Sequence, residues 1–150
     1  MGHDERPTAE AFTAQFCAYL TERGLRATDR RRMVADHLAT RGGHVTLQQL
    51  TDEIQAADAS VGHVTVYRAV RLLEDAGLVE RTTLGDVDRY EVAGAHHDHL
   101  VCDVCGRVVE FHEEAIERRQ RVVAAAHGFR MTDHAHVIHG VCRDCSAAEA

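Results

Sequence analysis

The sequence has no run of apolar residues long enough to cross a membrane. It also has no signal-peptide pattern, since its N-terminus is polar and acidic. Internal repeats and low-complexity segments are missing too. Apolar residues make up 45% and charged residues 27% of the 150 residues, which is typical of a globular protein. We therefore expect a cytoplasmic protein of one domain or two small ones, with no membrane partner.

Lysine is absent as well: all 17 basic residues are arginines, and the 24 acidic residues give a net charge of −7. An acidic chain matches nucleic acid poorly on average, but a local basic face can still bind phosphates. Net charge therefore does not exclude DNA binding, because the arginines cluster. The clusters are Arg23, Arg26, Arg30, Arg31 and Arg32, and then Arg68 and Arg71.

Cysteine and histidine are the residues that point to metal chemistry. In a reducing compartment, the five cysteines are better explained as metal ligands or redox groups than as disulfides. Most of the twelve histidines follow residue 93, which indicates metal binding in the C-terminal part. These histidines are His96, His97, His99, His112, His127, His134, His136 and His139.

The first part of the chain has apolar residues at helical spacing, followed by two alternating segments. Several short helices followed by a hairpin are typical of a winged helix-turn-helix, so residues 1–93 are predicted to form a DNA-binding domain. We expect Thr46 and Gln49 to form a capping box at the third helix, Ser60 to cap the fourth helix, and Gly85 to lie in the hairpin turn. The expected segments are helices over 9–23, 28–42, 46–57 and 60–77, and strands over 78–83 and 88–92.

The fourth helix is the candidate recognition helix. Its buried stripe leaves a set of polar side chains facing outward, of the types that contact bases and phosphates in a major groove. A solvated helix face is the alternative, but the hairpin directly after the helix favours DNA binding. The outward residues are Thr65, Tyr67, Arg68 and Arg71.

A small flexible stretch, Ala93-Gly94-Ala95, is a plausible hinge to a second domain over residues 94–150. Strands are expected over 99–102, 108–111 and 130–141, with a helix over 113–127 that buries Ile116, Val122 and Val123. The predicted class is thus α+β, a winged-helix domain followed by a small α/β domain.

Two Cys-x-x-Cys pairs are the strongest single signal in the sequence. They are Cys102 with Cys105, and Cys142 with Cys145. Four thiolates fill a tetrahedral coordination shell and leave no open position, which predicts a structural zinc site rather than a catalytic one. A redox pair normally begins a helix in a βαβ unit, and no such unit is expected here.

A second signal is the run His96-His97-Asp98-His99. On a strand, alternate side chains face opposite ways, so His97 and His99 would share one face, and His96 and Asp98 the other. One segment could then supply two metal sites, and mixed imidazole and carboxylate ligands suit Fe(II), Mn(II) or Zn(II). An exposed polar linker is the alternative. Candidate partners from elsewhere in the chain are Glu91, Glu110, Glu117 and His134.

Taken together, these motifs resemble those of the ferric uptake regulator family of bacterial metalloregulators. The resemblance extends from about Gly24 to Cys145. It implies a homodimer whose winged-helix domains bind a palindromic DNA operator when loaded with metal. The matching residues are Gly62-His-Val-Thr-Val-Tyr-Arg68, the run from His96 to Gly106, Val109-Glu-Phe111, Glu117, and Cys142-Arg-Asp-Cys145.

The resemblance also assigns roles to residues. It implies a sensing site at the hinge, a second site in the dimerisation domain, and the zinc site already described. It further implies major-groove contacts from Tyr67 and Arg68 and a minor-groove contact from Arg26. The sensing site maps to His44, Glu91, His97, His99 and Glu110, and the second site maps to His96, Asp98, Glu117 and His134.

The sensed metal is expected to be Fe(II). Peroxide-sensing members of the family carry aspartate where this chain has Glu91 and Glu110, and zinc-sensing members commonly place a cysteine in the hinge site. Sensing of Zn(II), Mn(II) or peroxide is the alternative within the family, because first-row metals compete for such sites.

Two functions from other classes compete with a regulator. A zinc-dependent hydrolase needs an open coordination position and a general base, and the sequence has no H-E-x-x-H run. A metal-buffering protein would not need the outward Tyr67, Arg68 and Arg71. We therefore expect a metal-dependent transcriptional repressor of metal uptake genes, with no enzymatic activity and no small-molecule substrate.

Overall fold

A computed structural model describes residues 7–84, 86–94 and 96–148. It divides into two compact units, Met1–Ala95 and His96–Ala150, each of which is described by itself. No helix among the described residues is both long enough and apolar enough to span a bilayer.

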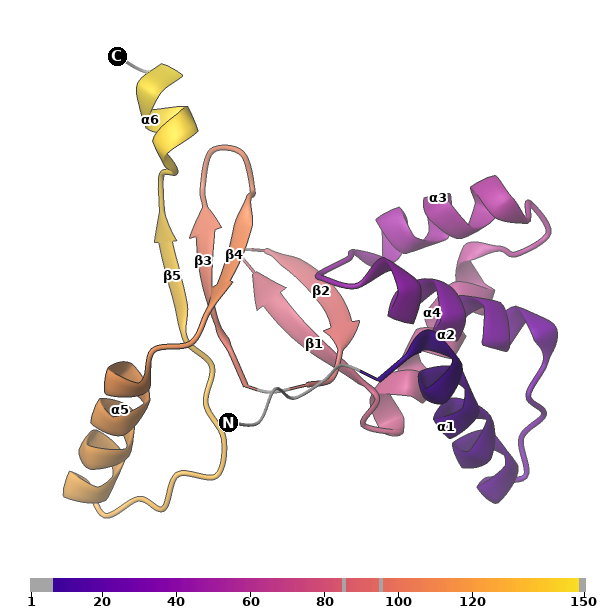
Figure 1. Cartoon of the computed structure of the whole chain (residues 1–150), viewed down its shortest axis with the longest axis horizontal. Coiled ribbons are helices and arrows are strands. Elements are labelled where there is room, and N and C mark those ends of the chain that lie inside the picture. Colours follow the sequence, from indigo (N-terminus) through magenta and orange to yellow (C-terminus); the bar gives the residue numbers. More distant parts are fainter. Residues whose placement is uncertain (1–6, 85, 95, 149–150) are drawn as a thin grey trace. The chain divides into compact units, whose positions relative to one another are not determined.

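The first unit contains four helices followed by a two-stranded hairpin (Figure 1). Threonines begin three of the helices: the hydroxyls of Thr8, Thr28 and Thr46 each accept a backbone N–H of the first turn. At the third helix, the side chain of Gln49 in turn accepts a hydrogen bond from the backbone N–H of Thr46, which completes the predicted capping box. The elements are α1 (Ala9–Glu22), α2 (Asp29–Arg41), α3 (Leu47–Ala57), α4 (His63–Asp75), β1 (Val79–Leu84) and β2 (Val87–Val92).

A single apolar core holds these helices together. Each helix buries the stripe that its helical spacing predicts, and the central side chains are at most 2% exposed. Burial of each such side chain stabilises the fold by about 1.5–3 kcal/mol relative to exposure. The core includes Phe12, Phe16 and Leu20 of α1, Val34 and Leu38 of α2, Leu50 and Ile54 of α3, and Val66, Val70 and Leu73 of α4.

The start of α4 differs from the prediction. Ser60 does not cap this helix, because it lies two residues before the N-cap, and its hydroxyl oxygen accepts from Arg30 at 3.4 Å instead. The helix begins at His63 instead, after an N-cap at Gly62 that supplies no side-chain acceptor. The helix-turn-helix of α3 and α4 is therefore as expected, with a turn that is longer by two residues.

The hairpin pairs β1 with β2 antiparallel, in a register that places Val79 opposite Val92. Gly85, which is expected in the turn, lies outside the described residues. An isolated bridge adds Val45 to the other edge of β2, opposite Tyr90. The hairpin, which is the wing of the winged helix, is thus hydrogen-bonded to the segment between α2 and α3.

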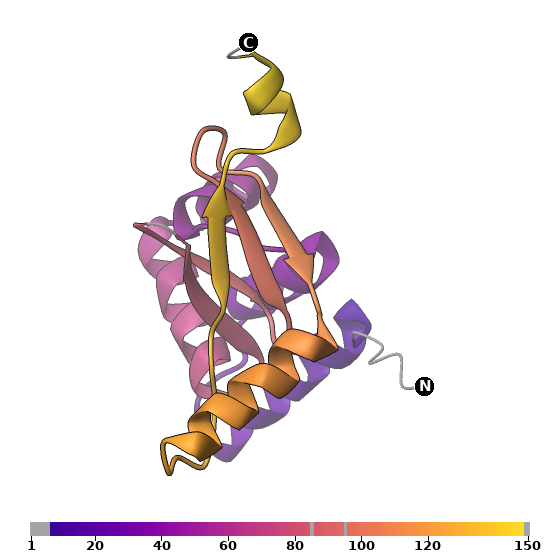
Figure 2. The ribbon, with the colours of Figure 1, turned by 90° about the vertical axis from the view of Figure 1, so that its left-hand side faces the viewer.

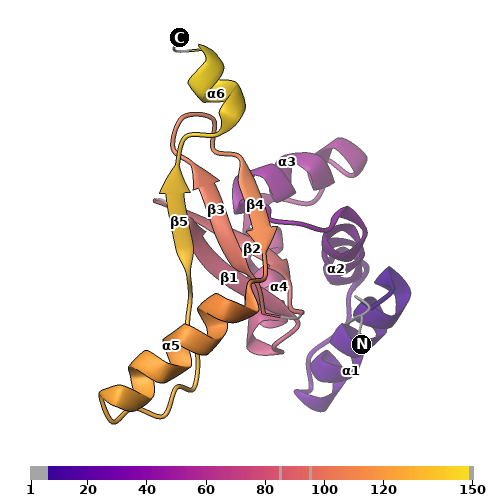
Figure 3. The same ribbon diagram turned by 60° about the vertical axis from the view of Figure 1, so that its left-hand side comes forward.

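The second unit is a three-stranded sheet with two helices. Its strand order is β4-β3-β5, with β3 antiparallel to β4 and parallel to β5. Figure 2 shows α5 at one end of this sheet and α6 beyond the other end, and Figure 3 shows the same arrangement from another side. The elements are β3 (Asp98–Cys102), β4 (Val108–Phe111), α5 (Glu114–Ala126), β5 (Val137–Gly140) and α6 (Arg143–Ala148).

Two expectations for this unit were wrong, and one element was missed. The last strand is shorter than 130–141, because only Val137–Gly140 pairs with β3. Val122 and Val123 of α5 are 50% and 46% exposed rather than inside, and the buried residue of this helix is Glu117. The short helix α6 was not anticipated, since six residues hold too little periodicity to predict one.

Candidate metal centres and nucleic-acid interface

The four cysteines of the two Cys-x-x-Cys pairs converge, with all four sulfur atoms within 4.8 Å of one another. The first pair closes the β3–β4 turn, where Gly106 adopts a positive φ of 71°. The Sγ atoms of Cys105 and Cys142 lie 3.8 Å apart. Four sulfurs at a Zn–S distance of about 2.3 Å in a tetrahedron are separated by about 3.8 Å, so the spacing fits zinc.

The thiol groups of this cluster have strongly divided pKa values. Backbone N–H groups of Cys105 and Cys142 lower the pKa of Cys102 to about 6, the latter at 3.3 Å from its sulfur. Hydrogen bonds with the sulfurs of Cys142 and Cys105 raise the pKa of Cys145 to about 12. The site is thus built to stabilise thiolate character at Cys102, and a cation would release the remaining protons.

The second pair begins a helix, since α6 starts at Arg143, directly after Cys142. No strand follows α6 among the described residues, so this helix is not part of a βαβ unit. What distinguishes the site from a redox centre is the convergence of all four sulfurs on one point. Cys17 of α1 is remote from them in the sequence and lies in the other unit.

A second convergent group joins His96, Asp98, Glu117 and His134, again with one ligand atom from each within 4.8 Å of the others. Nε2 of His134 and Nε2 of His96 lie 3.1 Å and 3.4 Å from the same oxygen of Glu117. These residues come from the segment before β3, from β3, from α5 and from the loop before β5.

Two carboxylates of this group are buried, which requires compensation by cations or donors. The Asp98 side chain is fully buried, and among the described residues its Oδ2 has no hydrogen-bond partner. Burial acts to raise the pKa of Glu117, but the hydrogen bond with His134 and the nearby imidazoles outweigh burial, so its pKa is lowered. Both features fit a site for a divalent cation.

His136 was not predicted to have a role here. Its Nδ1 lies 3.6 Å from Oδ2 of Asp98, beyond hydrogen-bond distance, whereas His96 lies near the other oxygen, Oδ1. The histidine count after residue 93 was the only signal in the sequence, and it does not single out one residue.

In the first unit, Nε2 of His44 lies 3.1 Å from Oε1 of Glu91. The bridge between Val45 and Tyr90 explains this pairing, because antiparallel neighbours on either side of a bridge also face each other. Tyr90 accepts from and donates to Val45 at 3.0 Å and 2.8 Å. The backbone thus places an imidazole and a carboxylate together.

In the second unit, the rings of His97 and His99 pack edge to face, with centroids 4.9 Å apart. Glu110 lies opposite His99 in the β3–β4 register. His96 lies 3.3 Å from Asp98, so the run divides into the two pairs predicted. The reason is partly different, since the strand begins only at Asp98.

The α4 helix presents the predicted outward residues to different degrees. Tyr67 is 46% exposed and Arg68 is exposed, while Thr65 and Arg71 are half-buried. Arg71 donates to Glu74 of the same helix at 2.7 Å. Arg26, in the loop between α1 and α2, lines one surface hollow together with Thr65, Arg68 and four further residues with charged side chains, Asp29, Arg30, Arg31 and Asp58.

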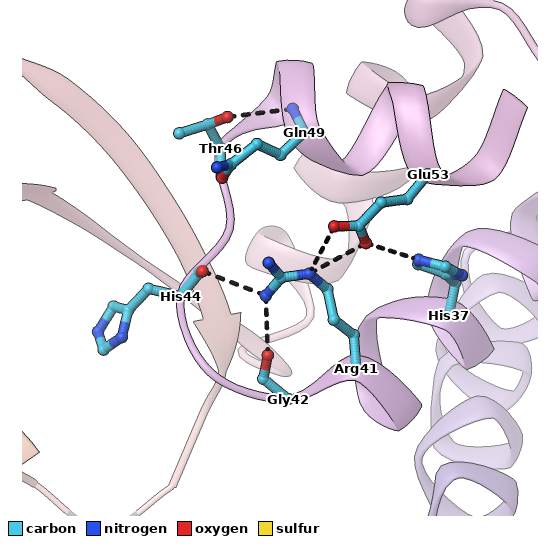
Figure 4. Close-up of polar contacts among 7 residues, drawn as sticks. All are labelled: His37, Arg41, Gly42, His44, Thr46, Gln49 and Glu53. Atoms are coloured by element: carbon cyan, nitrogen blue, oxygen red, sulfur yellow. Dashed lines mark hydrogen bonds and ion pairs between the residues drawn. The ribbon is translucent and has the colours of Figure 1, made fainter. Parts of the chain in front are cut away.

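Sequence reasoning missed a polar cluster at the end of α2 (Figure 4). Glu53 of α3 accepts a hydrogen bond from Nε of Arg41 at 3.0 Å and lies 2.9 Å from Nε2 of His37. The same arginine donates from Nη1 to the carbonyls of Gly42 and His44. No periodicity signals such a contact, because the partners belong to two helices.

Comparison with known proteins gives consistent matches over nearly the whole chain. The sequence model described as "Ferric uptake regulator family" matches residues 22–139. A protein named ferric uptake regulation protein from Campylobacter jejuni is 39% identical over 140 residues, which are 91% of this chain and 89% of that protein.

Solved structures agree with these matches. The ferric uptake regulator of Helicobacter pylori, described as revealing three functional metal binding sites, has a TM-score of 0.89 and 26% identity over 97% of this chain and 98% of that one. A zinc uptake regulator complexed with zinc and DNA has a TM-score of 0.62 and 26% identity, over 95% and 98% of the two chains.

Proposed function

The chain belongs to the ferric uptake regulator family, and on that premise we propose that it is a metal-dependent transcriptional repressor. As a homodimer it binds a palindromic operator when loaded with divalent metal, Fe(II) in the first place, and controls metal uptake genes. It acts in the cytoplasm, where its cysteines stay reduced, and it is not an enzyme.

The observation that carries this proposal is the pairing of His44 with Glu91 inside the winged-helix unit. A DNA-binding unit that holds part of a metal site can respond to metal directly. His97 and His99, paired in the second unit, supply the remaining imidazoles, and Glu110 opposite His99 supplies a further carboxylate. These five residues form the proposed sensing site.

The other two clusters have separate roles in this proposal. Cys102, Cys105, Cys142 and Cys145 hold structural zinc, which joins α6 to the β3–β4 turn and stabilises a unit with few buried apolar residues. The second site, composed of His96, Asp98, Glu117 and His134, takes a borderline divalent ion on its imidazoles and carboxylates. The H. pylori relative, with three functional metal binding sites, supports a set of three.

Metal loading acts through a shift in population. When bound, the ion supplies two positive charges and bonds that His44 and Glu91 share with His97 and His99. These residues favour one arrangement of the two units only as far as they bind the ion better in that arrangement. An operator presents successive major-groove faces about 34 Å apart, so only a narrow set of dimer geometries binds it.

Charge assists geometry. The carboxylates of Glu91, Glu110, Asp98 and Glu117 repel phosphates when no metal is bound, and divalent cations bound to them offset that repulsion. This explains how a chain with a net charge of −7 can bind DNA when it is loaded with metal.

DNA is read by α4 in this proposal. Tyr67 and Arg68 contact bases in the major groove, helped by Thr65, and Arg26 reaches the minor groove. Arg71 contributes least, because it must leave Glu74 before it reaches a phosphate. The structurally similar zinc uptake regulator is complexed with DNA, which supports the assignment.

The homodimer is supported by an apolar row across the sheet of the second unit. Leu100 lies opposite Val109 on one side and Ile138 on the other. These side chains are 41%, 40% and 39% exposed, and Val122 and Val123 of α5 are also exposed. Contiguous exposed apolar residues mark a protein interface, and here the proposed occupant is a second copy of the chain.

A mobility-shift assay tests the function. The full-length protein is titrated onto an AT-rich palindrome with and without Fe(II), Mn(II) or Zn(II). We expect a shift that depends on metal, and a double variant His97→Ala, His99→Ala that no longer responds. A response to Zn(II) alone, or loss of binding after peroxide treatment, would assign another branch of the family. If no metal produced a shift, the regulator proposal would be wrong.

A further inference from the structure

Arg41 connects three parts of the winged-helix unit in the structure. Its Nε donates to both oxygens of Glu53 on α3 at 3.0 Å each. Its Nη1 donates to the backbone carbonyls of Gly42 at 3.1 Å and His44 at 3.2 Å. The planar guanidinium can donate to the carboxylate and to the two carbonyls at once, because its N–H groups form a rigid fork.

The segment that carries His44 is fixed residue by residue. The carbonyl of His44 is held by Arg41, the next residue Val45 is bridged to Tyr90 on β2, and Thr46 is held in the capping box with Gln49. Each of three successive residues is thus anchored to a different element. Gly42 and Gly43, both at positive φ, make the tight approach from α2 that this requires.

The side chain and the carbonyl of His44 point in different directions. Figure 4 shows its imidazole directed away from Arg41, while its carbonyl faces the guanidinium. The ring is directed to Glu91, with Nε2 at 3.1 Å. Arg41 therefore acts on the backbone of His44 and leaves its ring to the carboxylate of Glu91.

We propose that Arg41 is a positioning residue of the regulatory metal site, which links the ligand His44 to α3 of the helix-turn-helix through Glu53. This inference rests on the proposed function, because it takes His44 as a regulatory ligand. Arg41 has two consequences. It holds His44 where the metal needs it, and it ties that position to the helix that packs beside the recognition helix α4.

His37 completes the link from the α2 side. Its Nε2 lies 2.9 Å from Oε2 of Glu53, so the carboxylate that holds Arg41 is itself held from a second point on α2. A side chain that is oriented by a partner loses less entropy on forming its contacts. The carboxylate of Glu53 therefore acts together with Arg41 in positioning His44.

The test measures the metal requirement of Arg41→Gln in the full-length dimer. Operator binding is followed by fluorescence anisotropy during a Mn(II) titration, and Mn(II) affinity is measured separately with a competing chelator. Loss of groups that orient metal ligands typically costs 10- to 100-fold in metal affinity. We expect the Mn(II) midpoint to rise about tenfold, with operator affinity at saturating Mn(II) unchanged.

Further variants separate positioning from general damage. Glu53→Gln should shift the midpoint in the same direction, and the double variant should shift it by less than the sum of the two, because both act on one contact. The Mn(II) midpoint of Arg41→Lys should lie between those of wild type and Arg41→Gln, since an ammonium group cannot donate to the carboxylate and to both carbonyls at once. Thr40→Ala, at the exposed residue directly before Arg41 on the same helix, leaves the charge unaltered; it is the matched control and should behave as wild type.

Each failure has a separate meaning. A wild-type protein with no metal response would remove the proposed function itself. A wild-type response together with an unchanged Mn(II) midpoint in Arg41→Gln would overturn only this inference. An equal loss of operator affinity with and without metal would overturn it too, because it would show that Arg41 merely stabilises the helix-turn-helix.

Discussion

His44 and Glu91 face each other across 3.1 Å because Val45 forms a bridge with Tyr90. The imidazole thus comes from the connection between α2 and α3, and the carboxylate from the strand of the wing. Both elements belong to the unit that reads DNA. The pair is therefore formed by the fold of that unit alone, before any ion has to organise it.

The first prediction concerns Glu91→Ala. Removal of this carboxylate takes one ligand from the proposed sensing site, and we expect the Mn(II) midpoint for operator binding to rise at least tenfold. Anisotropy of a labelled operator checks this. Glu80→Ala is the matched control, because Glu80 lies opposite Glu91 in the hairpin and is exposed. Equal midpoints for the two variants would contradict the assignment of Glu91.

Local patterns in the sequence were enough to predict most of the elements. The helices predicted from apolar spacing in the first unit, the capping box at Thr46 and the convergence of the four cysteines were confirmed. Each of these predictions rests on a pattern of only a few residues. Ser60 was misjudged as a cap, since α4 begins only at His63, after an N-cap at Gly62. A serine shortly before a helix does not show at which residue the helix begins.

Contacts between distant residues were harder to predict. His44 entered only through the family resemblance, because nothing near it in the sequence marks its pairing with Glu91. The contact between Arg41 and Glu53 was missed for the same reason. Val122 was expected inside because helical spacing marks an apolar face, but spacing does not say whether the same chain covers that face.

The second prediction concerns the recognition helix. Arg68→Ala should weaken operator binding by about 1–3 kcal/mol, roughly 5- to 150-fold, at saturating metal. Arg26→Ala should weaken it too and reduce the slope of log affinity against log salt by about 1, if Arg26 lies near phosphates. Arg107→Ala, an exposed arginine of the second unit, is the control. Titrations at several salt concentrations measure both effects, and an Arg68 variant with wild-type affinity would exclude α4 as the reader.

The third prediction concerns the four-cysteine cluster. Cys105→Ser should remove the tightly bound zinc and destabilise the protein by about 3 kcal/mol or more, which lowers the unfolding midpoint by roughly 10 °C or more. Metal analysis of the purified chain and calorimetry measure the two effects. Cys17→Ser is the matched control, because Cys17 lies in α1 and outside the cluster. Full zinc content in the Cys105 variant would contradict the site.

The fourth prediction concerns the apolar row of the sheet. Leu100→Asp places a charge at its centre, between Val109 and Ile138, and should turn the dimer into a monomer at micromolar concentration. Operator affinity should fall as the dimer dissociates, because a palindrome is bound by two DNA-binding units. Analytical ultracentrifugation gives the oligomeric state. Val87→Asp, at an exposed valine of the hairpin, should remain dimeric, and a dimeric Leu100 variant would show that the subunits meet elsewhere.

The fifth prediction concerns pH and Glu53. The hydrogen bond with His37 lowers the pKa of this carboxyl below its ordinary value of 4.5; burial opposes the shift and Arg41 adds to it. A carboxyl whose pKa is lower in the folded state contributes stability above its unfolded pKa, and this is lost as the pH falls through the folded value. Glu53→Gln removes that contribution, so the variant should be less stable than wild type at neutral pH.

The size of the difference is modest, because the Glu53 side chain is 38% exposed and solvent screens its contacts. We expect about 0.2–1 kcal/mol at pH 7. Urea midpoints of wild type and Glu53→Gln, measured from pH 7 to pH 3, should differ by a constant amount down to about pH 5 and then converge. Zinc release at low pH affects both proteins and cancels in the difference. Glu22→Gln, an exposed glutamate of α1, should show no such convergence, and a difference for Glu53→Gln that grew toward acid would mean that the pKa of Glu53 is raised in the folded state.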